Sequence, residues 1–121
     1  MTSAGAGSAP SRTLLALGLL FLLALMPRLY SAQTLGWNWD APNSFTLINF
    51  DEGGSCRAAL RGFPYSTFVG HQTIALASAL GLPPPTGVES DRGAVKAYCH
   101  SPGHILVARS YSAILGALTV V

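Results

Sequence analysis

Ser55 lies in the segment of this chain whose residue order is best suited to covalent chemistry. It follows the turn-forming residues DEGG at 51–54, with a predicted strand before the turn and a predicted helix after it. A serine on a tight glycine turn at the start of a helix can act as a nucleophile, and the backbone N–H groups of Gly54 and Cys56 could hold an oxyanion. The pattern G-x-S-x-G is absent, however, and serine is a common N-cap. Ser55 as a plain helix cap is therefore the simpler interpretation.

The residues around Ser55 resemble the first block of the SGNH or GDSL-type lipolytic esterases. Gly53-Gly54-Ser55 is similar in position to the Gly-Asp-Ser block of that family, and the segment 65–83 is similar to the helix that follows it. Gly54 stands where the family has Asp, and the later Gly, Asn and Asp-x-x-His blocks have no match. The resemblance implies a serine ester hydrolase of which this chain holds only the first portion, without a complete triad.

Cys56 and Cys99 are the only two cysteines in the sequence. An even number of cysteines in a small exported domain predicts a disulfide, which would close a long loop and stabilise the fold by roughly 4 kcal/mol. Two buried free thiols are the alternative interpretation, since cysteine also packs as a small hydrophobic residue. A reactive pair would be expected at the closer Cys-x-x-Cys spacing.

The histidines provide a second candidate site. Cys99, His100 and His104 form the pattern C-H-x-x-x-H, and His71 would have to supply a fourth metal ligand from another segment. A disulfide would remove Cys99 from this set, and the helix start at Ser101-Pro102 separates the two nearby histidines. We therefore expect neither a metal nor another cofactor, and we expect His104 to face solvent.

The N-terminal segment 1–32 is typical of an export signal. Arg12 precedes the apolar run LLALGLLFLLALM at 14–26, and small residues follow at Ser31 and Ala32. A charged start, an apolar middle and a small-residue exit predict a signal peptide. Thirteen apolar residues are few for a permanent span, which needs about 20. Cleavage after Ala32 would leave a small domain, 33–121, that is secreted or periplasmic.

Two residues argue against efficient cleavage of this signal. Tyr30 occupies the position three residues before the cut, where a small side chain is preferred, and Arg28 is an unusual charge so close to it. An uncleaved signal anchor is therefore the alternative, with membrane association through residues 13–26 and with 33–121 outside the cytoplasm.

The charge balance excludes one class of partner. The formal net charge is +2, but two of the seven basic residues lie in the segment 1–32. Within 33–121, five basic residues balance five acidic ones: Arg57, Arg61, Arg92, Lys96 and Arg109 against Asp40, Asp51, Glu52, Glu89 and Asp91. Binding to nucleic acid is driven by neutralisation of phosphates, so we expect no nucleic-acid partner. The chain also lacks a polybasic membrane patch.

The elements that would position these residues are mainly helical. The alternating segment SFTLINF at 44–50 predicts a strand, and Trp37 and Trp39 before it would share one side of an extended segment, where we expect them in the core. Helices are predicted at 56–61, 67–80, 91–98 and 101–115, from their caps, glycine stops and apolar spacing. Residues 118–121, LTVV, predict a second short strand.

The sequence thus predicts a mainly helical α/β fold: one small domain with one or two strands and about three helices, or the first part of a larger fold. We interpret it as an exported, disulfide-linked domain with a binding or structural role. One alternative is a truncated or divergent SGNH/GDSL-like ester hydrolase that uses Ser55. Another is a membrane-anchored protein in which 67–80 and 105–121 pack against lipid or a partner. The sequence names neither a substrate nor a partner.

Overall fold

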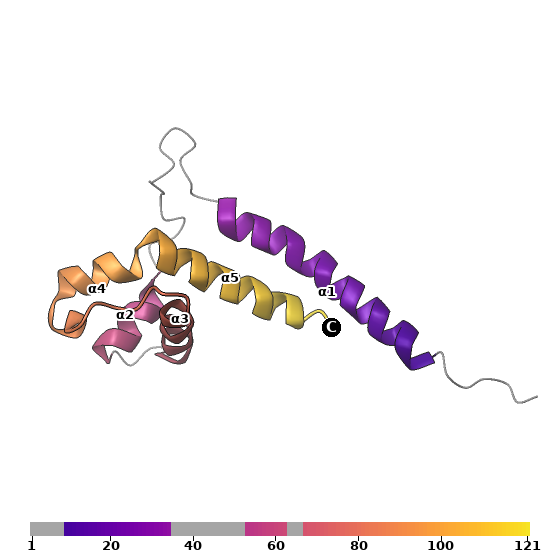
Figure 1. The fold of residues 1–121 in the computed structure, drawn as a ribbon, viewed down its shortest axis with the longest axis horizontal. Coiled ribbons are helices and arrows are strands. Elements are labelled where there is room, and N and C mark those ends of the chain that lie inside the picture. The colour runs from indigo at the N-terminus through magenta and orange to yellow at the C-terminus, as the bar shows by residue number, and fades with distance from the viewer. Residues whose placement is uncertain (1–8, 35–52, 63–66) are drawn as a thin grey trace, which may run out of the picture.

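The computed structural model describes residues 9–34, 53–62 and 67–121 (Figure 1). All the regular elements in these ranges are helices, so the predicted α/β fold is wrong and the described protein is a small helical domain. The predicted strand at 44–50, the two tryptophans and the acidic pair at 51–52 lie outside the described residues. The elements are α1 (Ala9–Thr34), α2 (Gly54–Arg61), α3 (Thr67–Ala79), the 3-10 helix η1 (Val88–Ser90), α4 (Arg92–Cys99) and α5 (Pro102–Leu118).

The predicted strand at 118–121 is wrong for a local reason. α5 continues through Leu118, and Thr119 keeps right-handed helical angles, φ −74° and ψ −8°. Its N–H bonds back to the Leu115 carbonyl, and the Val120 N–H bonds to the Ala117 carbonyl. A strand needs a partner strand to complete its hydrogen bonds, and no strand lies in the described part of the chain. The β-branched residues therefore finish a helix.

α1 is a single helix of 26 residues that runs through residues 9–32 of the predicted signal segment. Leucine and alanine are strong helix formers, and they supply half of this sequence. Ser11–Thr34 is long and apolar enough to cross a membrane, although a signal sequence near an N-terminus meets the same criteria. Pro27 lies inside the helix and cannot donate the backbone hydrogen bond of that turn.

α5 connects two parts of the molecule. Figure 1 shows α2, α3 and α4 gathered at its N-terminal end, while α1 runs antiparallel along its C-terminal half. α2 packs mainly on α3, and α3 also packs on α5, where the Tyr111 hydroxyl donates a hydrogen bond to Gln72 Oε1. We call α2, α3, η1, α4 and the N-terminal half of α5 the helical head. The N-terminal half of α1 extends beyond α5 and away from this head.

The core of the helical head is small and has the two cysteines at its centre. Cys56, Val88, Val95 and Cys99 are buried together. Four partly buried side chains pack around this cluster: Leu60, Ile74, Ala94 and Tyr98. Few large apolar side chains are buried here, so the fold depends strongly on the covalent link at its centre.

The predicted helix ends agree with the structure where glycine or proline decides them. Gly62 and Gly81 both take left-handed angles, with φ 68° and φ 83°. After α3, the Gly81 N–H bonds to the Ser78 carbonyl and the Leu82 N–H bonds to the Ala77 carbonyl, which is a Schellman motif. Ser101 caps α5, with its Oγ accepting from the His104 N–H at 3.3 Å. Pro102 occupies the first helical position, as predicted.

Candidate functional site

Ser55 is the second residue of α2 and not its N-cap. The N-cap is Gly53, whose left-handed angles (φ 80°, ψ −2°) start the helix two residues earlier than the sequence suggests. Gly54 and Cys56 lie with Ser55 in the first turn of α2, where backbone N–H groups have no partner within the helix. The proposed oxyanion donors and the hydroxyl are thus in one turn, and the role of Ser55 as a nucleophile stays a prediction.

The carbonyl of Ser55 lies against α3. A Cβ atom on Gly70 would stand only 1.9 Å from the Ser55 carbonyl oxygen and 2.9 Å from Ala59 Cβ. α2 and α3 therefore touch backbone to backbone, and this contact fixes the first turn of α2. Sequence reasoning did not find Gly70, since nothing local distinguishes it from other helical glycines.

The predicted disulfide between Cys56 and Cys99 is present. It joins α2 to α4 across a sequence separation of 43 residues, with the two Cα atoms 5.7 Å apart. The bond removes Cys99 from the C-H-x-x-x-H pattern. In the parts of the chain that the structure describes, no three His, Cys, Asp or Glu side chains lie close enough together to hold a metal ion.

The bond also brings His100 over the start of α2. His100 is the C-cap of α4, and its ring lies against Gly53: a Cβ on Gly53 would stand 2.7 Å from His100 Cδ2 and 2.8 Å from the Cys99 carbonyl oxygen. Glycine is therefore required at position 53 for two reasons: the positive φ and the close approach of α4.

His104 is buried, and the prediction that it faces solvent is wrong. The turn between α4 and α5 folds the first turn of α5 back onto α4, so the His104 ring packs against Tyr98 with the ring centres 5.1 Å apart. The side chain is 1 % exposed. Neither ring nitrogen has a hydrogen-bond partner among the described residues. Burial lowers the pKa of His104, so its neutral form is favoured.

Tyr98 completes this small cluster. Its hydroxyl donates a hydrogen bond to the Leu82 carbonyl at 2.9 Å, which ties the segment after α3 to α4. Burial raises the pKa of Tyr98, so the hydroxyl keeps its proton. The cluster holds the helical head together, and its buried histidine makes that role sensitive to pH.

We expect the helical head to lose stability as the pH falls below about 6.5 because of His104. The pKa of His104 is lowered in the folded state. In the unfolded chain the histidine binds a proton near its ordinary value, so acid favours unfolding until the pH falls to the folded pKa. The loss is up to about 1.4 kcal/mol per pH unit, measured by urea unfolding at pH 8, 7, 6 and 5.

The matched variants for this experiment are His104→Phe and His71→Gln. His104→Phe keeps a ring in the core and should flatten the loss of stability with acid. His71 is exposed on α3, so His71→Gln should leave that loss unchanged. An unchanged acid slope in His104→Phe would contradict the assignment of the effect to His104.

The second candidate site is the seam between α1 and α5. Within residues 21–32, the partly or fully buried residues of α1 share one face: Phe21, Ala24, Leu25, Leu29 and Ala32. α5 is the one described element that α1 contacts, so this face is covered by α5. The Arg28 side chain lies over Gly116, where a Cβ would stand 3.4 Å from Arg28 Nε. Its Nη1 also donates to the Ala24 carbonyl at 2.7 Å.

Ala32, the expected cleavage position, is part of this seam. It is helical, and it is 9 % exposed. The opposite face of α1 is apolar and exposed, with Leu19, Leu22, Leu23 and Met26 on it. The seam therefore fastens the C-terminal half of α1 to the domain and leaves an apolar surface facing outward.

Comparisons with known protein families, with curated proteins and with solved structures find no match to this chain.

Proposed function

We propose that this protein is a membrane-anchored module in which α1 is kept and the helical head is held outside the cytoplasm in a binding or structural role. The observation that carries the proposal is the packing of α1 on α5. A signal peptide that is cut off contributes nothing to the mature fold, whereas the half of α1 beyond Leu20 buries one face on α5.

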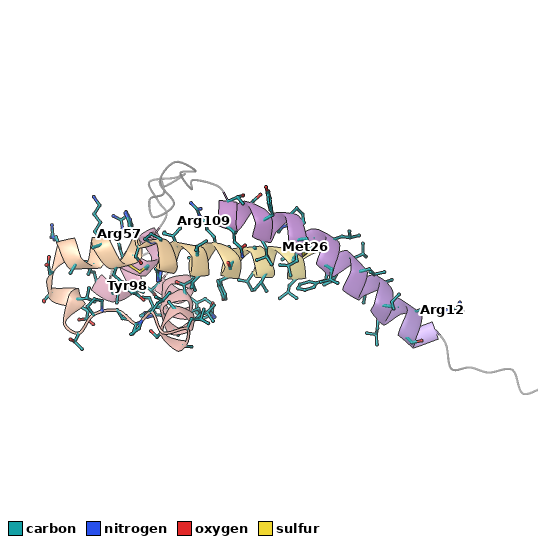
Figure 2. The ribbon with its side chains drawn as sticks, turned by 45° about the horizontal axis from the view of Figure 1, so that its top comes forward. Arg12, Met26, Arg57, Tyr98 and Arg109 are labelled. Atoms are coloured by element: carbon teal, nitrogen blue, oxygen red, sulfur yellow. A yellow bond between two sulfur atoms is a disulfide. The ribbon has the colours of Figure 1, made fainter. Side chains whose placement is uncertain are left out.

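The exposed surface of α1 supports the same proposal. Leu14, Leu15, Leu17, Leu19 and Leu20 are all exposed and lie on the part of the helix that extends away from the domain (Figure 2). A run of exposed leucines of this length is costly in water and is stable in hydrocarbon. The disulfide supports the placement of the head, because such bonds persist in oxidising compartments.

The proposal is tested by the intact mass of the protein recovered from its native cells. We expect the chain to retain residues 1–32, apart from removal of Met1, and to stay with the membranes after washing at alkaline pH. Its Cys56 and Cys99 should resist alkylation until a reductant is added. A soluble chain that begins near Gln33 would contradict the proposal.

Tyr30→Ala is the matched variant for this test. It supplies the small residue that cleavage after Ala32 prefers at the third position before the cut. Tyr30 is exposed on α1, so the substitution should not disturb the seam with α5. We expect part of the variant to be cut and released, which shows that cleavage is detectable when it occurs.

Hydrolysis by Ser55 is the alternative function. It requires a general base near Ser55 Oγ. Turnover of a short-chain chromogenic ester that is lost in Ser55→Ala would favour that alternative over a binding or structural role.

A further inference from the structure

The C-terminal end of α5 carries an exposed apolar surface that the helical head does not cover. Five residues form this surface, which we call the C-terminal apolar patch: Ile114, Leu115, Leu118, Val120 and Val121. Each is at least 40 % exposed. The last formally charged residue before the patch is Arg109, so twelve uncharged side chains follow it. An apolar surface of this kind on a small protein marks a contact with a membrane or with another molecule.

The position of the patch indicates its partner. The C-terminal half of α5 runs beside α1, and the end of α5 lies near Met26, at the base of the part of α1 that extends beyond the domain (Figure 2). Leu22, Leu23 and Met26 are exposed on α1 at this level. The patch therefore lies at the base of the α1 extension, whose leucines are exposed, and α2, α3 and α4 lie at the other end of α5 (Figure 1).

The charges at this level fit a membrane boundary. Arg28 is the one charged residue of α1 beside the end of α5, where its side chain lies over Gly116 and its guanidinium donates to the Ala24 carbonyl. Arg109 lies five residues before the patch, on the side of the head. Residues 110–121 carry no charged side chain.

We propose that the C-terminal apolar patch enters the outer headgroup and acyl-chain boundary of the same bilayer that α1 spans. The inference rests on the proposed retention of α1 as an anchor. The patch then acts as a shallow second contact, about 5–10 Å deep, and α1 and α5 enter the lipid side by side. Together they hold the helical head at a fixed height and orientation over the membrane.

The experiment is photolabelling of the full chain in vesicles of phosphatidylcholine and phosphatidylglycerol. These vesicles contain a phosphatidylcholine with a diazirine on its acyl chain. Trypsin divides the chain conveniently, because cleavage after arginine releases 13–28 from α1, 62–92 with α3, and 110–121 with the patch. We expect lipid adducts on 13–28 and on 110–121, and few on 62–92.

The outcomes separate the two proposals. Adducts on 13–28 without adducts on 110–121 overturn the role of the patch and keep the anchor. A second copy of the chain or another protein would then cover the patch. Adducts on neither peptide overturn the anchor as well. Equal labelling of 62–92 also overturns the inference, because the head would then lie flat on the lipid.

Leu118→Asp is the variant that tests the patch. Leu118 is 52 % exposed, so the new carboxylate lies on the surface of the patch. We expect adducts on 110–121 to fall about fivefold or more, with those on 13–28 unchanged, because a charge is costly at this depth. Leu80→Asp is the control, since Leu80 follows α3 in the head and is 64 % exposed. It should leave both labelled peptides as they are, and a loss of 110–121 adducts in this control would overturn the assignment to the patch.

Discussion

Replacing both cysteines, Cys56→Ala with Cys99→Ala, is expected to lower the free energy of unfolding of the helical head by about 4 kcal/mol. The bond closes a loop across a separation of 43 residues, so breaking it restores much conformational freedom to the unfolded chain. Small domains have a total stability of about 5–10 kcal/mol, and the double variant should therefore unfold at far lower urea. Urea unfolding followed by circular dichroism measures the difference.

The parent protein treated with a reductant is the control for this experiment. Its stability should fall by nearly the same amount, because the disulfide is absent from both samples. The reduced cysteine side chains keep their volume in the core, so the loss reports the link alone. A loss below about 1 kcal/mol in both samples would contradict the central role of the bond. It would mean that the apolar cluster around Val88 and Val95 holds the head by itself.

Gly70→Ala is the single substitution with the largest expected effect on stability. The added methyl group would stand 1.9 Å from the Ser55 carbonyl oxygen, so α2 and α3 must move apart. Both atoms belong to helices, and neither can turn aside as the end of a flexible side chain can. We expect a loss of about 3 kcal/mol, measured by the same urea unfolding.

Gly54→Ala is the matched control for that variant. Gly54 begins α2 in ordinary helical conformation, and a Cβ there meets nothing within 4 Å. Alanine is the better helix former and reduces the freedom of the unfolded chain, so the control should equal or slightly exceed the parent in stability. Equal losses in Gly54→Ala and Gly70→Ala would contradict the close approach of the two helices.

The features that were predictable from the sequence are those that a few adjacent residues determine. Gly62 and Gly81 end helices by their own backbone freedom, and Ser101-Pro102 starts one by its own side chain and ring. The disulfide was predictable because only two cysteines exist. These features require no knowledge of the tertiary structure.

The features that were missed depend on segments far apart in the sequence. His104 occupies a position that would be exposed on an isolated helix, and it is buried only because α4 folds against α5. Gly70 is an ordinary helical glycine until Ser55 is placed beside it. Likewise, the residue types at 118–121 predict a strand, and only the fold shows that the described residues contain no partner strand for it.

The candidate site shows the same division between local and distant information. The turn at Gly53-Gly54-Ser55 was visible as a turn, but its register was not, because the left-handed Gly53 starts α2 before Ser55. The seam between α1 and α5 was not predictable from composition, since signal peptides and anchors share the same apolar leucines. The packing of Ala32 and its neighbours on α5 supports the proposed anchor.

The disulfide has a consequence for the order in which this protein is made. In the reducing cytosol the two sulfurs stay apart, and a head that lacks about 4 kcal/mol of a total of about 5–10 kcal/mol is only marginally stable. On the proposed export route, the reduced chain unfolds readily and can pass through a translocation channel. Oxidation on the far side then joins α2 to α4, and folding becomes complete only where the finished protein belongs.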